Sequence, residues 1–319
     1  MSAADEAAAP TAGDVRAGAV LLLLVSLIWG VTWPITKVAL WEMPVWHFRA
    51  ATVLVGGIGV MAVAWAAGFR LLPSRREVGP LLLAALFNIT LWTVLSAYGV
   101  ALMGAGRSAI IAFTMPLWAA VLSAVFLGER MTVAKVASLA LGVCGLAILV
   151  LPEWRQMAAA PAGFLVLLGS AVAWAIGTVI FKATPWRLST FVLGGWQLLL
   201  GGLPLPLGAI AVGETFDPGS LTWAGLAAVG FIVLFAYVLG QWGWLQAVRM
   251  LPATVASIGL LTVPAIGVAS SALMVGETPV WSDLAALVLV SAAVALVLTA
   301  GGRRSPNASS IEVPARDSS

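Results

Sequence analysis

Runs of apolar residues, each about 20 residues long, follow one another along almost the whole chain, with short polar or Gly- and Pro-containing breaks between them. A run of this length, folded as an α-helix, crosses the ~30 Å hydrocarbon core of a bilayer. A transmembrane β-strand needs only about 10 residues and alternates apolar with polar positions, so these runs do not fit a barrel. We therefore predict an all-α polytopic membrane protein with ten transmembrane helices. The predicted spans are residues 17–40, 45–68, 79–101, 107–127, 131–151, 162–183, 189–212, 221–246, 252–275 and 280–300.

Both ends of the chain lack such runs. Residues 1–16 are small and polar, and residues 301–319 are rich in Ser and too poor in apolar residues to fold alone, so both are predicted to be tails. No basic segment precedes the first run and no small-residue cleavage site follows it. Residues 17–40 are therefore predicted to be a retained span rather than a removed signal peptide.

Composition excludes most other classes of protein. Of the 319 residues, 61% are hydrophobic and only 9% are charged, whereas a soluble domain carries about 25% charged residues. A soluble enzyme and a nucleic-acid-binding domain are therefore excluded. Cys144 is the single cysteine, the chain has one histidine, and no phosphate-binding loop or nucleophile elbow is present. We expect no enzyme activity, catalytic residue, metal or cofactor.

Basic residues are concentrated in the short loops on one side of the predicted spans. The basic residues on the side of the N-terminus are Arg16, Arg70, Arg75, Arg76, Arg130, Lys135, Lys182, Arg187, Arg249, Arg303, Arg304 and Arg316. Arg49, Arg107 and Arg155 are assigned to the opposite side. Because cytoplasmic loops are enriched in Lys and Arg, both termini are predicted to be cytoplasmic, in a bacterial inner membrane. The net charge of +3 then reflects topology and not a nucleic-acid partner.

Two halves of the chain share a pattern of residues. Their matched positions are Pro116 with Pro264, Gly128 with Gly276 and Glu129 with Glu277, at a separation of 148, and Trp29 with Trp174 and Lys37 with Lys182, at a separation of 145. The pattern predicts homologous halves of five spans each, at residues 17–151 and 162–300. Since five is odd, the second half must enter the membrane from the opposite side, which is the inverted repeat typical of secondary transporters.

Ten spans in two halves, each with Pro-x11-Gly-Glu, resemble the drug/metabolite transporter superfamily in its ten-span EamA-type branch, over residues 17–300. The Trp-rich first span is similar to the aromatic amino acid and paraquat exporter group. The resemblance implies an alternating-access exporter of amino acids and related small metabolites, including aromatic ones, that acts in the lipid bilayer and is plausible as a monomer. An exporter of lipophilic cations, a channel and a non-transporting membrane scaffold are the alternatives.

Four helix faces are predicted to line a substrate site between the halves, because their polar and aromatic residues recur at helical spacing. These faces are Trp29, Trp33 and Lys37; Asn88, Trp92 and Ser96; Trp174, Thr178 and Lys182; and Tyr237, Gln241 and Trp244. Two structural alternatives remain open. The lysines can extend to the membrane surfaces on apolar stems, and the other polar side chains can serve helix–helix hydrogen bonds.

The prolines and glutamates that match between the two halves suggest roles in the fold. Pro34, Pro116 and Pro264 are candidate hinges for alternating access, or equally fixed kinks. A helix C-terminus disfavours an anion, so Glu129 and Glu277 are predicted to cap the span that follows each of them and to lie outside the substrate site.

No Asp or Glu lies near the middle of a predicted span. Proton-driven transporters commonly use a carboxylate within the membrane as the proton carrier. Transport is therefore predicted not to be coupled through a buried carboxylate, and facilitated exchange is favoured over coupling through Lys or His.

Overall fold

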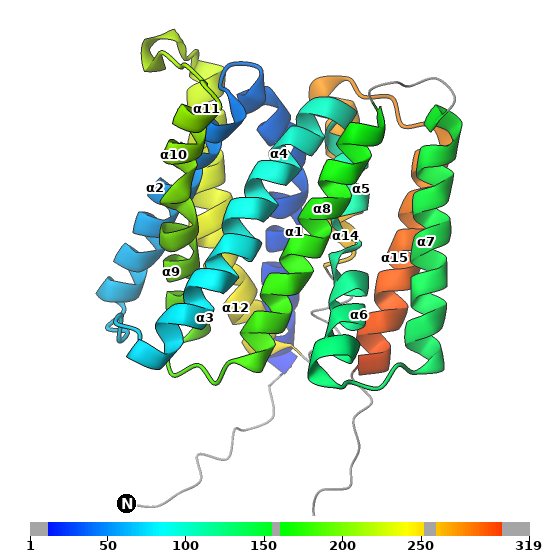
Figure 1. The fold of residues 1–319 in the computed structure, drawn as a ribbon, viewed down its shortest axis with the longest axis horizontal. Helices are drawn as coiled ribbons and strands as arrows, with labels where there is room; N and C mark the ends of the chain where they lie inside the picture. Colours follow the sequence, from blue (N-terminus) through cyan, green and yellow to red (C-terminus); the bar gives the residue numbers. More distant parts are fainter. Residues whose placement is uncertain (1–11, 155–159, 252–259, 302–319) are drawn as a thin grey trace, which may run out of the picture.

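In the computed structural model, residues 12–154, 160–251 and 260–301 are described, and within these ranges every regular element is a helix (Figure 1). In the part of the chain that the structure describes, eight helical segments are long and apolar enough to cross a membrane, and the apolar helices Val133–Leu149 and Thr262–Val275 are shorter. The prediction of an all-helical membrane protein is confirmed. Residues 252–259 of the predicted span 252–275, and residues 1–11 and 302–319 of the predicted tails, lie outside the described residues. The first helix begins at Ala12, within the predicted N-terminal tail.

The first half of the chain contains α1 to α7. Their bounds are α1 Ala12–Leu40, α2 Val45–Ala66, α3 Arg75–Ala85, the π-helical segment η1 Leu86–Leu91, α4 Trp92–Met103, α5 Ala105–Ala112, α6 Met115–Leu127 and α7 Val133–Trp154. In the second half, the bounds are α8 Ala160–Ala183, α9 Thr190–Gly202, α10 Pro204–Ala211, the short 3-10 helix η2 Pro218–Ser220, α11 Trp223–Phe231, the π-helical segment η3 Ile232–Leu239, α12 Gly240–Met250, α14 Thr262–Val275 and α15 Trp281–Gly301.

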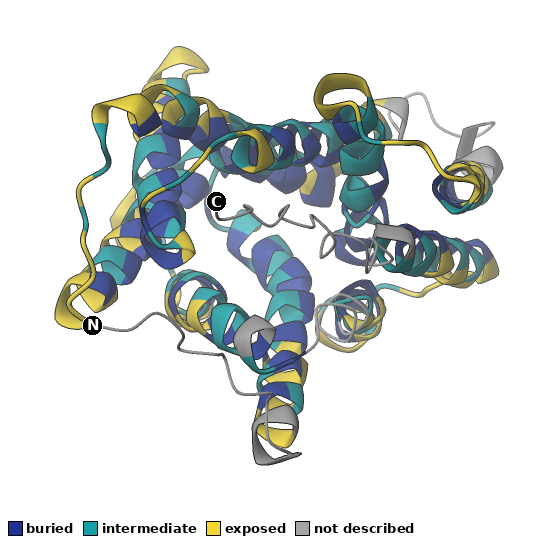
Figure 2. Cartoon of the chain, turned by 90° about the horizontal axis from the view of Figure 1, so that it is seen from below, coloured by how far each residue is buried: buried dark blue, intermediate teal, exposed yellow. Residues whose placement is uncertain are grey.

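The most extensive helix contacts join the two halves. Helix α1 packs against α14 and α12, α8 packs against α6 and α4, α2 packs against α9, and α7 packs against α15. Helix α1 begins and α15 ends at the same end of the bundle, the lower end in Figure 1. Figure 2 shows buried residues turned toward the interior and exposed ones on the outer surfaces and loops. Large exposed side chains such as Leu207, Leu273 and Val143 are apolar, as lipid contact requires.

Helical irregularities occur at corresponding places in the two halves. The π-helical segments η1 and η3 interrupt the spans Arg75–Met103 and Trp223–Ala247. Helix α6 begins just before Pro116, and Pro264 lies in the first turn of α14. A proline there removes no helical hydrogen bond, because the first-turn N–H groups have no partner within the helix. Pro34, in contrast, lies inside α1, which continues to Leu40.

Helices α6 and α14 end in the same way. Gly128 and Gly276 adopt left-handed backbone conformations, with φ of 66° and 68°. Their N–H groups donate to the carbonyl oxygens of Ser123 and Ser271. Glycine is the usual residue in this capping position, because a Cβ is strained there.

Replacing either capping glycine with alanine should destabilise the protein. Gly128→Ala and Gly276→Ala are each expected to cost about 1 kcal/mol, because a non-glycine residue pays roughly that amount in the left-handed region. Neither added Cβ would meet an atom within 4 Å, so the cost is conformational. Thermal unfolding of the detergent-solubilised protein measures the effect.

Gly230→Ala is the matched control, since Gly230 lies in α11, has no positive φ and is also open around its Cβ position. This change should leave stability unchanged or raise it by up to ~1 kcal/mol, the helix preference of Ala over Gly. Equal effects of all three substitutions would contradict the capping explanation.

Candidate functional site

Tryptophans of the predicted faces meet in two pairs, each joining the two halves of the chain. The rings of Trp92 and Trp174 lie 5.1 Å apart, and those of Trp29 and Trp244 lie 6.0 Å apart. The indole N–H of Trp29 donates to the carbonyl of Ala236 in η3, at 3.1 Å. The structure thus brings the four predicted faces together as two aromatic contacts between α4 and α8 and between α1 and α12.

Asn88 lies at the centre of a buried amide contact. Its Nδ2 donates to Oε1 of Gln197 at 3.0 Å, while its buried Oδ1 has no hydrogen-bond partner. Gly177 on α8 makes this position possible, because a Cβ there would overlap Asn88 Oδ1. Gln197 was not among the predicted site residues, although an amide within an apolar run was a signal that could have identified it.

The remaining predicted residues of the faces pack within the bundle. Trp33 is buried in a cluster that includes Trp92. The hydroxyl of Thr178 donates to the carbonyl of Trp174 on its own helix, at 2.9 Å. The amide of Gln241 lies over Gly194 of α9, where an added Cβ would lie 2.7 Å from Nε2.

Arg49 was assigned only to the membrane side opposite the N-terminus and was not among the predicted site residues. In the structure it lies in the second turn of α2, within the predicted span 45–68, and its side chain is buried. Its Nε donates to the carbonyl of Thr93 at 2.8 Å, and Nη2 donates to Oγ of Ser96 at 3.4 Å. The hydroxyl of Tyr237 also lies beside its guanidinium. Ser96 and Tyr237, both predicted site residues, therefore share one cationic partner.

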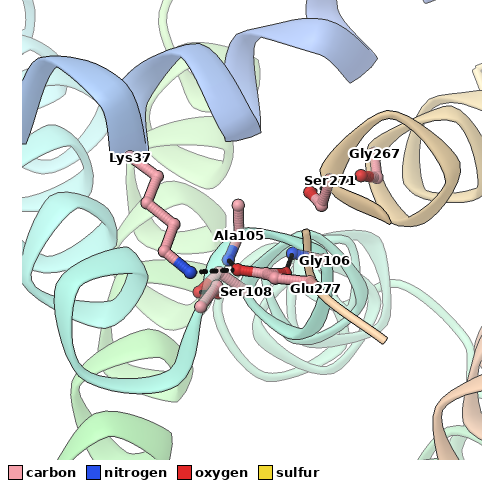
Figure 3. Close-up of polar contacts among 8 residues, drawn as sticks. Lys37, Ala105, Gly106, Ser108, Gly267, Ser271 and Glu277 are labelled. Atoms are coloured by element: carbon pink, nitrogen blue, oxygen red, sulfur yellow. Dashed lines mark hydrogen bonds and ion pairs between the residues drawn. The ribbon is translucent and has the colours of Figure 1, made fainter. Parts of the chain in front are cut away.

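At the upper end of the bundle, Lys37 of α1 forms an ion pair with Glu277, with Nζ and Oε1 2.6 Å apart (Figure 3). Glu277 also accepts hydrogen bonds from the N–H groups of Ala105 and Gly106, at 2.7 and 2.9 Å. The predicted role of Glu277 is thus wrong, because it caps α5 and not the span that follows it. The reason is Gly104, whose φ of 91° turns the start of α5 toward Glu277 and whose missing side chain leaves room for the carboxylate.

At the opposite end, Lys182 of α8 forms an ion pair with Glu129 at 2.7 Å. Lys135 of α7 contacts the other oxygen of the same carboxylate, at 3.1 Å. The predicted capping role of Glu129 is corrected in the same way, since the carboxylate bonds to lysine side chains. Both lysines of the matched pattern therefore form an ion pair with a glutamate of the other half of the chain.

Hydrogen bonds to these two glutamates favour their charged forms. Hydrogen bonds from Lys182 and Lys135 lower the pKa of Glu129. Burial raises the pKa of Glu277, but the hydrogen bonds from Lys37, Gly106 and Ala105 outweigh it, so that this pKa also lies below its ordinary value.

A cavity of about 360 Å³ opens beside the Lys37–Glu277 pair. A second ion pair, between Arg107 and Asp283 at 2.9 Å, also lines it. Asp283 further accepts from the N–H of Val280 before α15. The lining of this cavity thus carries both positive and negative side chains. Among the described residues, no group of three or more His, Cys, Asp and Glu side chains could hold a metal ion.

Membrane-length apolar helices, a lipid-type exterior and polar groups directed inward define a multi-pass helical membrane protein. The model of the EamA-like transporter family matches residues 16–151 and 161–299. The chain therefore belongs to the EamA-like transporter family.

Named relatives agree with this membership. The chain is 32% identical over 282 residues to "Uncharacterized transporter YvbV" of Bacillus subtilis, covering 88% of this chain and 91% of that protein. It is 28% identical over 286 residues to a "Probable amino-acid metabolite efflux pump" of Salmonella typhimurium, covering 85% and 91% of the two chains. One solved crystal structure, 20% identical, has a TM-score of 0.63 and covers 91% of this chain and 100% of its own, which shows a common fold.

The contribution of the Lys37–Glu277 pair to stability should depend on pH. Because the folded pKa of Glu277 lies below its ordinary value of 4.5, the pair stabilises the protein above that pH and loses its effect as the pH falls through the folded pKa. The unfolding temperature of the wild type should exceed that of Glu277→Gln at neutral pH. The difference should shrink below about pH 4.5.

Glu129→Gln is the matched variant and should show the same trend, since the pKa of Glu129 is also lowered. Thermal unfolding followed by tryptophan fluorescence across the pH range gives the comparison. A difference between wild type and variant that stays constant on acidification would contradict the assignment of these ion pairs.

Proposed function

We propose that the protein is a secondary transporter that exports amino acids and related small metabolites, including aromatic amino acids, by alternating access. The observation that carries the proposal is the crossed pairing of charges at the two ends of the bundle. Lys37 of the first half pairs with Glu277 of the second, and Lys182 of the second half pairs with Glu129 of the first. Each pair ties the halves together at one end only, which is what a gate requires.

Crossed contacts of this kind are what two inverted halves would produce. Lys182 lies 145 positions after Lys37, and Glu277 lies 148 positions after Glu129. The lysine of each half therefore pairs with the matched glutamate of the other half. Two backbone contacts join the halves in the same crossed way. The backbone of Thr222 donates to Glu42 and that of Arg187 donates to Glu77. These contacts support an inverted repeat of five spans in each half, at residues 17–151 and 162–300.

The shared end of α1 and α15 supports a topology with both termini on the same side. The excess of Lys and Arg in the loops on that side supports a cytoplasmic assignment in a bacterial inner membrane. The Lys37–Glu277 pair would then face outward and the Lys182–Glu129 pair inward. Both pairs are formed here, and in the proposed cycle the breaking of one pair while the other holds would expose one side.

Aromatic and amide side chains between the halves support an amphipathic substrate. The pairs Trp92–Trp174 and Trp29–Trp244 offer ring faces for an aromatic or aliphatic side chain. Asn88 and Gln197 can hydrogen-bond a polar head group. The same rings could bind a lipophilic cation, but Lys37, Lys182 and buried Arg49 would repel it. Relatives named as probable amino-acid metabolite efflux pumps support the first reading.

Counterflow in proteoliposomes tests the proposal. Vesicles loaded with unlabelled Trp, Phe, Met or Thr should accumulate the same labelled amino acid transiently and with saturation, without an imposed pH gradient. If paraquat shows counterflow and none of the amino acids does, the protein is a cation exporter and the proposal is overturned. Single-channel currents without counterflow would indicate a channel, and neither activity in a folded protein would indicate a scaffold.

Sided thiol labelling tests the two gates. In a Cys144→Ser background, a thiol introduced by Ser271→Cys on α14 lies buried beside α5 near Glu277, and one introduced by Thr178→Cys lies one turn before Lys182 on α8. Glu277→Gln should raise labelling of position 271 severalfold from the side of Lys37. Glu129→Gln should do the same for position 178 from the side of Lys182. An impermeant maleimide on right-side-out and inside-out membrane vesicles measures the rates.

Glu42→Gln is the matched control, because Glu42 lies at the same end of the bundle as Lys37 but accepts its hydrogen bonds from Thr222. It should leave labelling at position 271 unchanged. Glu277→Gln and Glu42→Gln raising labelling equally, or either gate variant exposing both sides, would overturn the gate assignment.

A further inference from the structure

Arg49 is a buried positive charge surrounded by neutral acceptors. It is 6% exposed, and its guanidinium donates to the carbonyl of Thr93 and the hydroxyl of Ser96. The hydroxyl of Tyr237 is its other polar neighbour. A guanidinium carries five N–H donors in a planar fork that matches a carboxylate in bidentate geometry.

No Asp or Glu in the described ranges forms an ion pair with Arg49. Glu214 is the carboxylate bound nearest to it along α2, and this side chain accepts from the N–H groups of Trp46 and His47 at the start of the helix. A charge buried in a membrane protein without a counter-charge is expensive. Arg49 is nevertheless buried, and the acids in the described ranges lie elsewhere.

The position of Arg49 coincides with the predicted substrate faces. Tyr237 is the fifteenth residue of the 25-residue span Trp223–Ala247, so its Cα lies near the middle of that span. Ser96 follows Trp92 by one helical turn, so Arg49 lies beside the same face as the Trp92–Trp174 pair. An aromatic pair and the guanidinium of Arg49 therefore both contact the same stretch of α4.

We propose that Arg49 is the binding residue for the carboxylate of the transported substrate, which supplies the counter-charge that the described acids do not. This inference rests on the proposed function and specifies its substrate class as small organic carboxylates, α-amino acids among them. In the closed conformation, Thr93, Ser96 and Tyr237 hold the guanidinium. On binding, the substrate carboxylate replaces the hydroxyl contacts, and the Trp pair contacts its side chain.

A purely structural role for Arg49 makes a different prediction. Thr93 follows the π-helical segment η1, and an arginine bound to its carbonyl could simply brace this irregular part of the span. A brace affects stability and the transport of every substrate alike. A carboxylate-binding residue instead affects acids and leaves unchanged the analogues in which an uncharged carboxamide replaces the carboxylate.

The experiment compares amino acids with their carboxamides on the full-length protein. Trp, Phe, Met and Thr and the four carboxamides are tested as competitors in counterflow and as stabilisers in thermal unfolding. In the wild type, the acid should compete at about tenfold lower concentration than its amide, as loss of one charge-assisted contact implies. In Arg49→Gln, which keeps a hydrogen-bond donor, half-saturation for the acid should rise about tenfold and the amide should change little.

Arg76→Gln, at an exposed arginine of α3, is the matched control and should keep the preference for the acid. Arg49→Lys, which keeps the positive charge but not the planar guanidinium, should keep part of the preference for the acid over its carboxamide. Equal loss of acid and amide binding in Arg49→Gln, or failure of both Arg49 variants to fold, would overturn the proposal in favour of a brace. If the wild type shows no counterflow, the proposed function fails, while acid-selective thermal stabilisation that depends on Arg49 would still establish the carboxylate site.

Discussion

The structure depends on one constraint: within a bilayer, each polar group must find its partner inside the protein. Carboxylates in the connecting segments and in the first turn of α3 meet this demand at the helix ends, because each accepts hydrogen bonds from N–H groups at or near the start of a helix distant in sequence. The pairs are Glu42 with Thr222, Glu77 with Arg187, Glu214 with Trp46 and Glu277 with Ala105. Helix N-termini favour negative charge, so these contacts are stabilising. They also join segments from the two halves of the chain.

The same constraint shapes the interior. The π-helical segments disturb the regular pairing of backbone carbonyls, and polar side chains supply donors near them. Trp29 donates to Ala236, the hydroxyl of Thr93 donates to Ile89, and Arg49 donates to Thr93. The residues that satisfy the backbone are therefore among those that we propose contact the substrate. Partners that satisfy one another in a closed conformation are available to a solute when the helices separate.

Hydrophobic periodicity predicted much of this arrangement. Apolar runs of about 20 residues located the spans, and the spacing of aromatic and polar residues located the faces that bring Trp92 to Trp174 and Trp29 to Trp244. The partners of the charged groups were not predictable in this way. Periodicity identifies the face of a helix but not the depth of a side chain or its neighbours, so Arg49 was not among the predicted site residues. Lys37 and Glu277 are 240 positions apart, and only tertiary packing brings them together.

The strength of the end pairs suits them to opening and closing. The side chains of Lys37 and Glu277 remain 25% and 21% exposed, and ion pairs in contact with water contribute only ~0–1 kcal/mol. A gate of this strength can open at little cost, whereas a dry hydrophobic plug of the same area would hold one state. Glu277 has one lysine and two backbone N–H partners, and Glu129 has two lysines. In the proposed alternating-access cycle, comparable pairing at both ends would keep the two opened states close in free energy, so that a bound solute could shift the equilibrium between them.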